Sequence, residues 1–434
     1  MVLDSSAHRL AYNRFRAYLD ASYVMGGGKS ILGLSVGYPQ PGEFPLPKVI
    51  LKHLAVEVDG KERPRAGYGW EMGAQPLREA LVDFENLLHG TRYGYKNICI
   101  VAGASYGFNR VVEALFERPG TGNKQIILVG PTFFRMTARV GRYAELLTVT
   151  GEESNDFQVT TEQLLCSVTE RTRAIFLVNP SNPTYKYYPP SFFEQVVPEL
   201  EKRGIYLVID ESGDAFHFGK SGARLMCYPP VIHSPNVIRI VTASKKYLLA
   251  EYRIGYVLAD EAFLTDKVYG LNKLVGDDIG NAPLAANEAW TQMARHEITL
   301  LSSERCNCSP DCDFESVMRA NTEKMKQLYS YSVSRLKAMG QVVNIIEPDC
   351  NFNITFNIRD TVFASDFELF SALLNEHKVS LLPCSGLGVP EEKMYFRLTY
   401  GINRQVLTTG LDMLSRFMHK YRAAGGAEVK NAEE

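Results

Sequence analysis

Short apolar runs alternate with helical patterns between about residues 75 and 260, and this alternation constrains the fold more than any other feature of the chain. The runs are rich in β-branched side chains and read NICIVAG, QIILVGP, RAIFLVNP, IYLVIDES and VIRIVTAS. Segments between them, such as FNRVVEALFER and SFFEQVVPELEKRG, have helical periodicity. Continuous apolar strands that alternate with helices are typical of a largely parallel sheet covered on both faces. The sequence therefore predicts an α/β fold.

The residues that follow each apolar run are the candidate site residues, because ligands of such sheets bind outside the carboxyl ends of the strands. These residues are 103–105, 131–133, 179–182, 210–211 and 242–246. Together they bring a glycine turn, an aromatic ring, an amide, a carboxylate and a lysine to one edge of the sheet. We expect a binding crevice there.

A change of pattern after residue 315 predicts a second, smaller domain. A long helical segment precedes the alternating strands NFNITFNI and KMYFRLTYGI and a last helix, which is α+β in character. We expect a large domain at 51–304 and a small domain formed by 305–421 together with 1–50. The N-terminal stretch has the pattern of an amphipathic helix. The small, polar stretch 422–434 is expected to be disordered.

Composition excludes several classes of protein. The chain of 434 residues has 47 basic and 49 acidic residues, a net charge of −2, and no basic stripe with interleaved aromatic residues. We therefore expect no nucleic-acid partner. No apolar run approaches transmembrane length and the N-terminus has no signal-peptide core, so we expect a cytoplasmic protein without a membrane partner. Its 8 cysteines are expected to be reduced thiols.

The chemistry of the strand ends points to one cofactor. A glycine turn that opens a helix suits a phosphate, and Arg253 offers a second phosphate anchor. Phe133 can cover a flat ring, Asp210 can pair with a ring nitrogen, and a lysine of the SKK cluster can form a Schiff base. This set describes pyridoxal 5'-phosphate.

The chain resembles the fold-type I pyridoxal-phosphate enzymes of the class I/II aminotransferase family. The resemblance runs from about residue 31 to 415 and rests on YGWEMGAQPLREAL, NPSNPT, IDES and SKKYLLAEYRIGY. It implies a mainly parallel seven-stranded sheet in the large domain and a homodimer. It also implies an enzyme that acts on an amino acid through an external aldimine and a quinonoid, with aminotransfer as the leading reaction.

The resemblance implies a role for each residue of the cofactor site. Lys245, chosen over Lys246 by its spacing to Arg253, forms the Schiff base and shuttles the proton. Asp210 pairs with the pyridine nitrogen, Asn182 bonds the ring 3-oxygen, and Phe133 stacks on the ring. The phosphate is bound by several residues, one of them from the neighbouring subunit: Ala104, Ser105, Thr242, Arg253 and, across the dimer interface, Tyr68.

The substrate residues follow from the same resemblance. Arg397, in YFRLTYG, matches the arginine that binds a substrate α-carboxylate, which is a bidentate task. Gly37, in SVGYP, matches the glycine that closes over that carboxylate. We also expect its neighbour Tyr38, and Asn182, to contact the substrate.

Departures from the family pattern leave the reaction open. Gly213 stands where the family has a tyrosine that bonds the 3-oxygen, Tyr185 follows Asn-Pro-Thr where a glycine is usual, and Glu251 replaces another glycine. Tyr185 could supply the missing phenol, or Gly213 could admit a bulkier substrate. The alternatives to aminotransfer are γ-elimination or replacement, for example on S-adenosylmethionine, and C–C bond formation in secondary metabolism. An effector-binding module is disfavoured, because about thirty residues before the matched region leave no room for a DNA-binding domain.

A cysteine-rich stretch, SSERCNCSPDCDFES, precedes the small domain. Cys306, Cys308 and Cys312 could bind zinc with His296 as the fourth ligand, but the spacing of the first two is tighter than in structural zinc sites. We expect reduced thiols and no metal.

Overall fold

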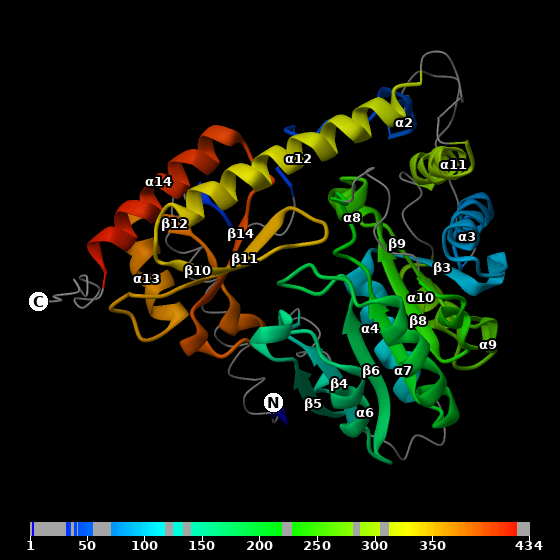
Figure 1. Ribbon diagram of the computed structural model, residues 1–434. Coiled ribbons are helices and arrows are strands. Elements are labelled where there is room, and N and C mark those ends of the chain that lie inside the picture. Colours follow the sequence, from blue (N-terminus) through cyan, green and yellow to red (C-terminus); the bar gives the residue numbers. More distant parts are fainter. Residues whose placement is uncertain are drawn as a thin grey trace, which may run out of the picture.

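A mainly parallel sheet forms the centre of the computed structural model (Figure 1), which describes residues 2–3, 32–35, 39–40, 42–54, 71–117, 125–132, 140–218, 228–280, 287–303 and 312–422. The strand order is β1-β5-β4-β6-β7-β8-β9-β3. The strands from β5 to β8 pair in parallel, whereas β9 is antiparallel to both β8 and β3. The bounds are β1 Val2–Leu3, β3 Ile98–Val101, β4 Gln125–Gly130, β5 Glu145–Thr150, β6 Thr172–Val178, β7 Tyr206–Asp210, β8 Val237–Thr242 and β9 Gly255–Leu258.

The expected seven-stranded, mainly parallel sheet is confirmed, and the two-residue β1 adds an eighth strand antiparallel to β5. All five apolar runs form strands. The sequence patterns did not single out β5 and β9, the first of which has an exposed charged residue at its start.

Helices cover both faces of the large sheet because successive strand side chains point to opposite faces. One face packs against α4 (Ala104–Glu117), α9 (Glu261–Thr265) and α10 (Leu271–Ile279). The opposite face packs against α6 (Thr161–Cys166) and α7 (Pro190–Lys202), and toward β3 and β9 against α3 (Gln75–His89) and α11 (Asn287–Ser303). On β6, for example, Phe176 belongs to the first face and Ile175 to the second.

A smaller antiparallel sheet lies beside the large one and has the order β10-β11-β14-β13. Its strands are β10 Val342–Ile346, β11 Asn353–Ile358, β13 Leu382–Pro383 and β14 Tyr395–Thr399. It packs with α12 (Phe314–Lys337), α13 (Asp366–His377) and α14 (Arg404–Lys420) around a separate core. The short strand β2 (Leu32–Gly33) pairs with β12 (Val379–Ser380), so an N-terminal segment joins this part of the molecule. In Figure 1, α12 extends from this sheet toward α2 (Lys48–Leu54) beside the large sheet.

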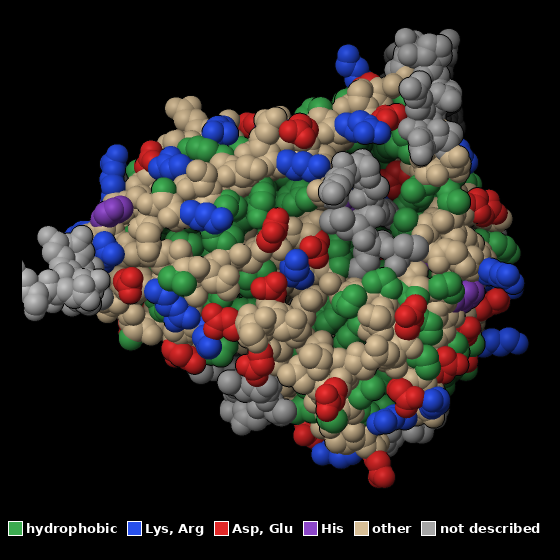
Figure 2. Space-filling view, in the orientation of Figure 1, with side chains coloured by type: hydrophobic (Ala, Val, Ile, Leu, Met, Phe, Trp, Pro, Cys, Tyr) green, Lys and Arg blue, Asp and Glu red, His purple; other side chains and the backbone are tan. Residues whose placement is uncertain are grey.

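The surface bears mixed charges on the face drawn in Figure 2, where basic and acidic side chains are interspersed. No helix in the part of the chain that the structure describes is long and apolar enough to cross a membrane. The expected N-terminal helix, apart from Val2 and Leu3, and the stretch 423–434 lie outside the described residues.

Candidate active site

The carboxyl ends of the parallel strands meet at one edge of the sheet, as the sequence predicts. Val178 at the end of β6 pairs with Asp210 at the end of β7, and Asp210 pairs with Ile240 near the end of β8. This register brings the segment after β6, the carboxylate of Asp210 and the lysine cluster after β8 to neighbouring positions.

At the start of α4, the backbone at two glycines, Gly103 and Gly255, passes very close to neighbouring atoms. Gly103 has φ +82°, and a Cβ atom there would lie 2.8 Å from Nη2 of Arg253. A Cβ at Gly255 would lie 2.7 Å from the carbonyl oxygen of Val241 and 3.3 Å from the backbone nitrogen of Ala104. Glycine is favoured at position 103 by its left-handed φ, and at position 255 by the backbone of Val241 and Ala104, which a Cβ atom would crowd. The amide end of α4, with Ala104 and Ser105, therefore faces a cation, which suits a phosphate.

Thr242 has a structural task at the end of β8. Its Oγ1 accepts a hydrogen bond from the backbone nitrogen of Ser244 at 3.2 Å and caps α8 (Ala243–Lys246). The same hydroxyl contacts the carbonyl oxygen of Ile254 at 3.0 Å. Thr242 thus links the lysine helix to the segment that leads from Arg253 into β9.

The two neighbouring lysines have different surroundings. Lys246 Nζ lies 2.7 Å from Glu297 Oε2 and packs over the rings of Phe84 and Tyr247. Lys245 has no hydrogen bond or ion pair with the described residues, and burial lowers its pKa to about 8. An amine that loses its proton near neutral pH is a nucleophile. Lys245 is therefore the lysine whose environment suits Schiff-base chemistry.

Asp210 provides a carboxylate opposite Lys245. Its Oδ1 accepts a hydrogen bond from the backbone nitrogen of Ser212 at 2.8 Å and another from the Ser212 hydroxyl. Burial raises the pKa of Asp210, against the opposing effects of these hydrogen bonds and of the Lys245 charge. Among the described residues no cation forms a hydrogen bond or ion pair with Asp210, and such a buried carboxylate can accept a protonated ring nitrogen.

Arg397 and Asn182 connect the two sheets at the site. Arg397, on β14, is 6% exposed, and its Nη1 donates to Oδ1 of Asn182 at 3.0 Å. Because Asn182 Oδ1 is an acceptor here, its Nδ2 remains able to donate to a ring oxygen. Nη2 of Arg397 donates to the carbonyl oxygen of Ser35 at 3.4 Å. The charge of Arg397 also acts on Lys245, which places the two cations near each other.

Tyr185 and Gly213, the two departures from the family pattern, lie in contact. A Cβ at Gly213 would lie 3.4 Å from Cε1 of Tyr185 and 3.1 Å from Cγ of Pro180. Tyr185 is 1% exposed and has φ +57°. Its ring fills space into which a side chain at position 213 would point.

Four expected site residues, Gly37, Tyr38, Tyr68 and Phe133, lie outside the described residues, as do Cys306 and Cys308. Sγ of Cys312 lies 3.8 Å from Nδ1 of His296, whose ring stacks on Phe314. Within the described ranges, no three His, Cys, Asp or Glu side chains are placed to hold a metal ion.

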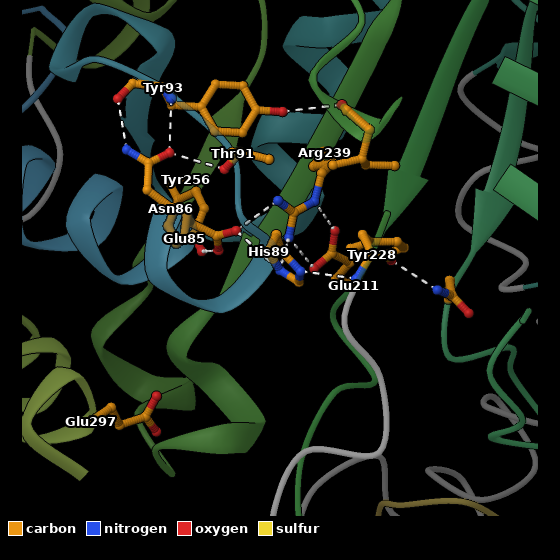
Figure 3. Close-up of polar contacts among 12 residues, drawn as sticks. Glu85, Asn86, His89, Thr91, Tyr93, Glu211, Tyr228, Arg239, Tyr256 and Glu297 are labelled. Atoms are coloured by element: carbon orange, nitrogen blue, oxygen red, sulfur yellow. Dashed lines mark hydrogen bonds and ion pairs between the residues drawn. The ribbon is translucent and has the colours of Figure 1, made fainter. Parts of the chain in front are cut away.

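A buried charge cluster next to the site was not anticipated from the sequence (Figure 3). Arg239 on β8 is 1% exposed, and its Nη1 lies 2.6 Å from Oε2 of Glu85 on α3. Its Nε and Nη2 donate to the two carboxylate oxygens of Glu211, at 2.5 and 3.0 Å. Two carboxylates therefore share one guanidinium. An arginine within VIRIVTAS was the available signal, because a charge in a buried strand needs a partner.

The protonation of this cluster follows from its contacts. Nδ1 of His89 accepts a hydrogen bond from the Tyr228 backbone at 3.0 Å, so a neutral His89 carries its proton on Nε2, 3.4 Å from Glu85. Although burial opposes it, the Arg239 charge lowers the pKa of Glu85. Burial raises the pKa of Glu211 to about 7. Glu211 is adjacent in sequence to Asp210, so this titrating carboxyl borders the active site.

Comparison with known proteins identifies the class of enzyme. The model of the family "aminotransferase class I and II" matches residues 29–414. An aspartate aminotransferase of Pyrococcus horikoshii is 26% identical over 89% of this chain and 90% of its own length. A probable aspartate/prephenate aminotransferase of Aquifex aeolicus is 24% identical, with 92% and 94% covered. The solved aspartate aminotransferase of Thermotoga maritima superposes with a TM-score of 0.73 at 21% identity, covering 93% of this chain and 96% of that one.

The fold and the site together define a fold-type I enzyme that depends on pyridoxal phosphate. The chain belongs to the aminotransferase class I and II family and is a transferase of the aminotransferase type.

Proposed function

We propose that this enzyme converts an amino acid into the corresponding 2-oxo acid as an aminotransferase, and that Lys245 would hold the pyridoxal phosphate on which this chemistry depends. The observation that carries the proposal is the contrast between the two lysines. Lys246 forms an ion pair with Glu297, whereas Lys245 has a lowered pKa and interacts electrostatically with Asp210. When bound, pyridoxal phosphate supplies an electron-withdrawing ring that stabilises negative charge at the substrate α-carbon.

The residues of the chain divide the remaining tasks. Lys245 Nζ would hold the cofactor and would move the proton at the substrate α-carbon. Asp210 would keep the ring nitrogen protonated, and Asn182 Nδ2 would donate to the ring 3-oxygen. Ala104, Ser105, Thr242 and Arg253 would hold the phosphate, and Phe133 would cover the ring, as the family resemblance implies.

The substrate carboxylate binds Arg397, whose position is fixed by its bond to Asn182. Gly37 and Tyr38 complete this end of the site. Relatives named as aspartate aminotransferases make L-aspartate the first amino acid to test. A specialised substrate of secondary metabolism would agree with the Gly213 departure.

We propose a cytoplasmic homodimer in which Tyr68 reaches the phosphate of the neighbouring subunit. The family resemblance supports this arrangement. Sedimentation of the holoenzyme should give twice the monomer mass, and mixing Tyr68→Phe with Lys245→Ala protein should restore some intact sites. A fully active monomer would contradict the dimer.

Borohydride reduction tests the assignment of the lysine. Reduction of the yellow holoenzyme should attach the cofactor to Lys245, as peptide mapping would show. Lys245→Ala should lose this adduct, and the matched variant Lys246→Ala should retain it. If Lys245→Ala retains the adduct and Lys246→Ala loses it, the assignment of the lysine is reversed.

The visible spectrum tests the type of reaction. Adding an amino acid to the holoenzyme should convert the visible band to that of the pyridoxamine form. Release of ammonia without this conversion would favour elimination.

A further inference from the structure

The hydroxyl of Tyr185 lies at the junction of the two sheets, in a fully buried polar network. Oη of Tyr185 is 3.1 Å from Nδ2 of Asn353 on β11. Burial raises the pKa of Tyr185, and Arg397 opposes this effect both through its charge and as a hydrogen-bond donor to the hydroxyl. The phenol is therefore a neutral O–H next to a guanidinium.

The directions of the hydrogen bonds in this network are fixed by backbone groups. Asn351 Oδ1 accepts from the backbone nitrogen of Phe352 at 2.8 Å, and Asn351 Nδ2 donates to the carbonyl oxygen of Gly213. Asn353 must therefore present Nδ2 to Asn351 Oδ1, 2.9 Å away. Its Oδ1 is then left to contact the Thr399 hydroxyl, at 2.7 Å.

It follows that Tyr185 Oη accepts the bond from Asn353 Nδ2. A phenol that accepts keeps its own proton for donation. The neighbouring guanidinium cannot accept a proton, and no described residue accepts the Tyr185 hydroxyl proton.

Arg397 presents a second donor of the same kind. Its Nη1 and Nη2 have partners, but its buried Nε has no acceptor among the described residues. Leaving a buried donor unsatisfied destabilises the folded state, so native structures rarely keep one without a reason. The Tyr185 hydroxyl and Nε of Arg397 are therefore two hydrogen-bond donors that need an acceptor, and the guanidinium carries a positive charge. A negatively charged ligand whose atoms only accept hydrogen bonds would satisfy both. A carboxylate has this chemistry.

We propose that the Tyr185 hydroxyl, together with Arg397, binds the α-carboxylate of the substrate. This inference rests on the proposed function, and it makes Tyr185 a substrate-binding residue of the carboxylate site. The phenol then serves the substrate and not the cofactor. A Cβ at Gly213 would touch the ring of Tyr185 at 3.4 Å and would crowd Cγ and the carbonyl oxygen of Pro180, at 3.1 and 3.3 Å, so a larger side chain at position 213 would compete with Tyr185 for space.

Acetate tests this proposal because it presents a carboxylate without a side chain. Calorimetric titration of the holoenzyme with sodium acetate, against sodium chloride at equal ionic strength, should give saturable binding. Tyr185→Phe should weaken acetate binding about tenfold or more, since a hydrogen bond to a charged group is lost. Tyr188→Phe is the matched control, because its hydroxyl contacts only the backbone nitrogen of Val159, at 3.1 Å, among the bonds that the structure gives it. This control should bind acetate as wild type does.

A second variant tests the direction of the hydrogen bond. In Asn353→Asp the carboxylate would accept the Tyr185 proton and repel the ligand, so acetate affinity should fall although the phenol is retained. Unchanged affinity in Asn353→Asp would contradict the donation by Tyr185.

The remaining outcomes separate the inference from the function on which it rests. If Arg397→Ala abolishes acetate binding but Tyr185→Phe does not weaken it, the inference is wrong and the carboxylate site stands. If wild type does not bind acetate, or Arg397→Ala binds it normally, the proposed carboxylate site itself is wrong. If Tyr185→Phe instead shifts the pH titration of the visible band without acetate, the phenol serves the cofactor and the inference is overturned.

Discussion

Asp210 and Lys245 are electrostatic partners at the ends of neighbouring strand segments, and each charge favours the ionised form of the other. Burial outweighs this attraction for both groups, since it raises the pKa of Asp210 and lowers that of Lys245 to about 8. Burial therefore makes Lys245 easier to deprotonate and Asp210 harder to ionise than the same groups in water.

The lowered pKa of Lys245 predicts the pH dependence of cofactor uptake. Only the neutral amine attacks an aldehyde, so the rate at which cofactor-free protein takes up pyridoxal phosphate should rise with pH and level off above about 8. An ordinary lysine would give a rate that still rises toward its pKa of about 10.4. Stopped-flow absorbance at several pH values measures this midpoint. A midpoint near the ordinary value would mean that the amine is not buried in solution.

Loss of the Arg397 guanidinium should reduce amino-acid binding and spare the cofactor. Arg397→Ala should weaken binding of L-aspartate by about 2–5 kcal/mol, because a charge-assisted pair is lost while its partner stays buried. The visible spectrum of the ligand-free holoenzyme should be nearly unchanged. Arg359→Ala is a suitable control, since Arg359 directly follows β11 and is a 39% exposed side chain whose Nη2 lies 3.7 Å from Oε1 of Glu153. If the two variants bind L-aspartate with equal affinity, Arg397 does not bind the substrate carboxylate.

Arg239 should contribute more to stability than an exposed arginine does. Arg239→Leu would leave Glu85 and Glu211 buried without their cation, which should cost about 3–5 kcal/mol of unfolding free energy. Arg171→Leu removes an exposed pair with Glu145, whose side chains are 62% and 49% exposed, and should cost less than about 1 kcal/mol. Urea unfolding of the two variants compares these effects. Similar midpoints would show that the buried cluster is not needed for stability.

Glu211 should make stability depend on pH near neutrality. Its folded pKa, about 7, is above the unfolded value of 4.5, so its contribution is present at low pH and lost as pH rises through 7. Glu211→Gln mimics the protonated form and leaves the Glu85–Arg239 pair balanced. The unfolding free energy of wild type relative to this variant should therefore fall by on the order of 2 kcal/mol between about pH 5 and about pH 8. If the difference in unfolding free energy between wild type and Glu211→Gln stays constant across this range, Glu211 does not lose its proton there in the folded protein.

Gly213 and Tyr185 should behave as one packing unit. Gly213→Tyr alone should destabilise the protein, because its Cβ would already lie 3.1 Å from Pro180 and 3.4 Å from the Tyr185 ring. Tyr185→Gly alone should leave a cavity, with partial relief because glycine tolerates φ +57°. The exchange of both residues should cost less than the sum of the single changes. Thermal unfolding of the three variants gives this coupling, and strict additivity would argue against contact in solution.

Strand ends were predictable from the sequence because a buried parallel sheet needs continuous apolar runs. That pattern located β3, β4, β6, β7 and β8 and the chemistry that follows them. It did not single out β9, whose direction depends on its pairing between β8 and β3. Family spacing, not periodicity, separated Lys245 from Lys246. The structure adds the physical difference, which is the ion pair of Lys246 with Glu297.

The sequence alone determined the α/β fold and, through its family resemblance, the cofactor, and it predicted the residues that would bear the chemistry, since these depend on local patterns and on spacing along the chain. Tertiary structure decided which of these residues meet. Arg397 lies 215 residues from Asn182 in the chain yet contacts it, and Glu85 lies 154 residues from Arg239. The contact between Gly213 and Tyr185, and the direction of the hydrogen bond to Tyr185, depend on how the two sheets pack together. No local pattern encodes that packing, because its energy comes from side chains that are remote in sequence.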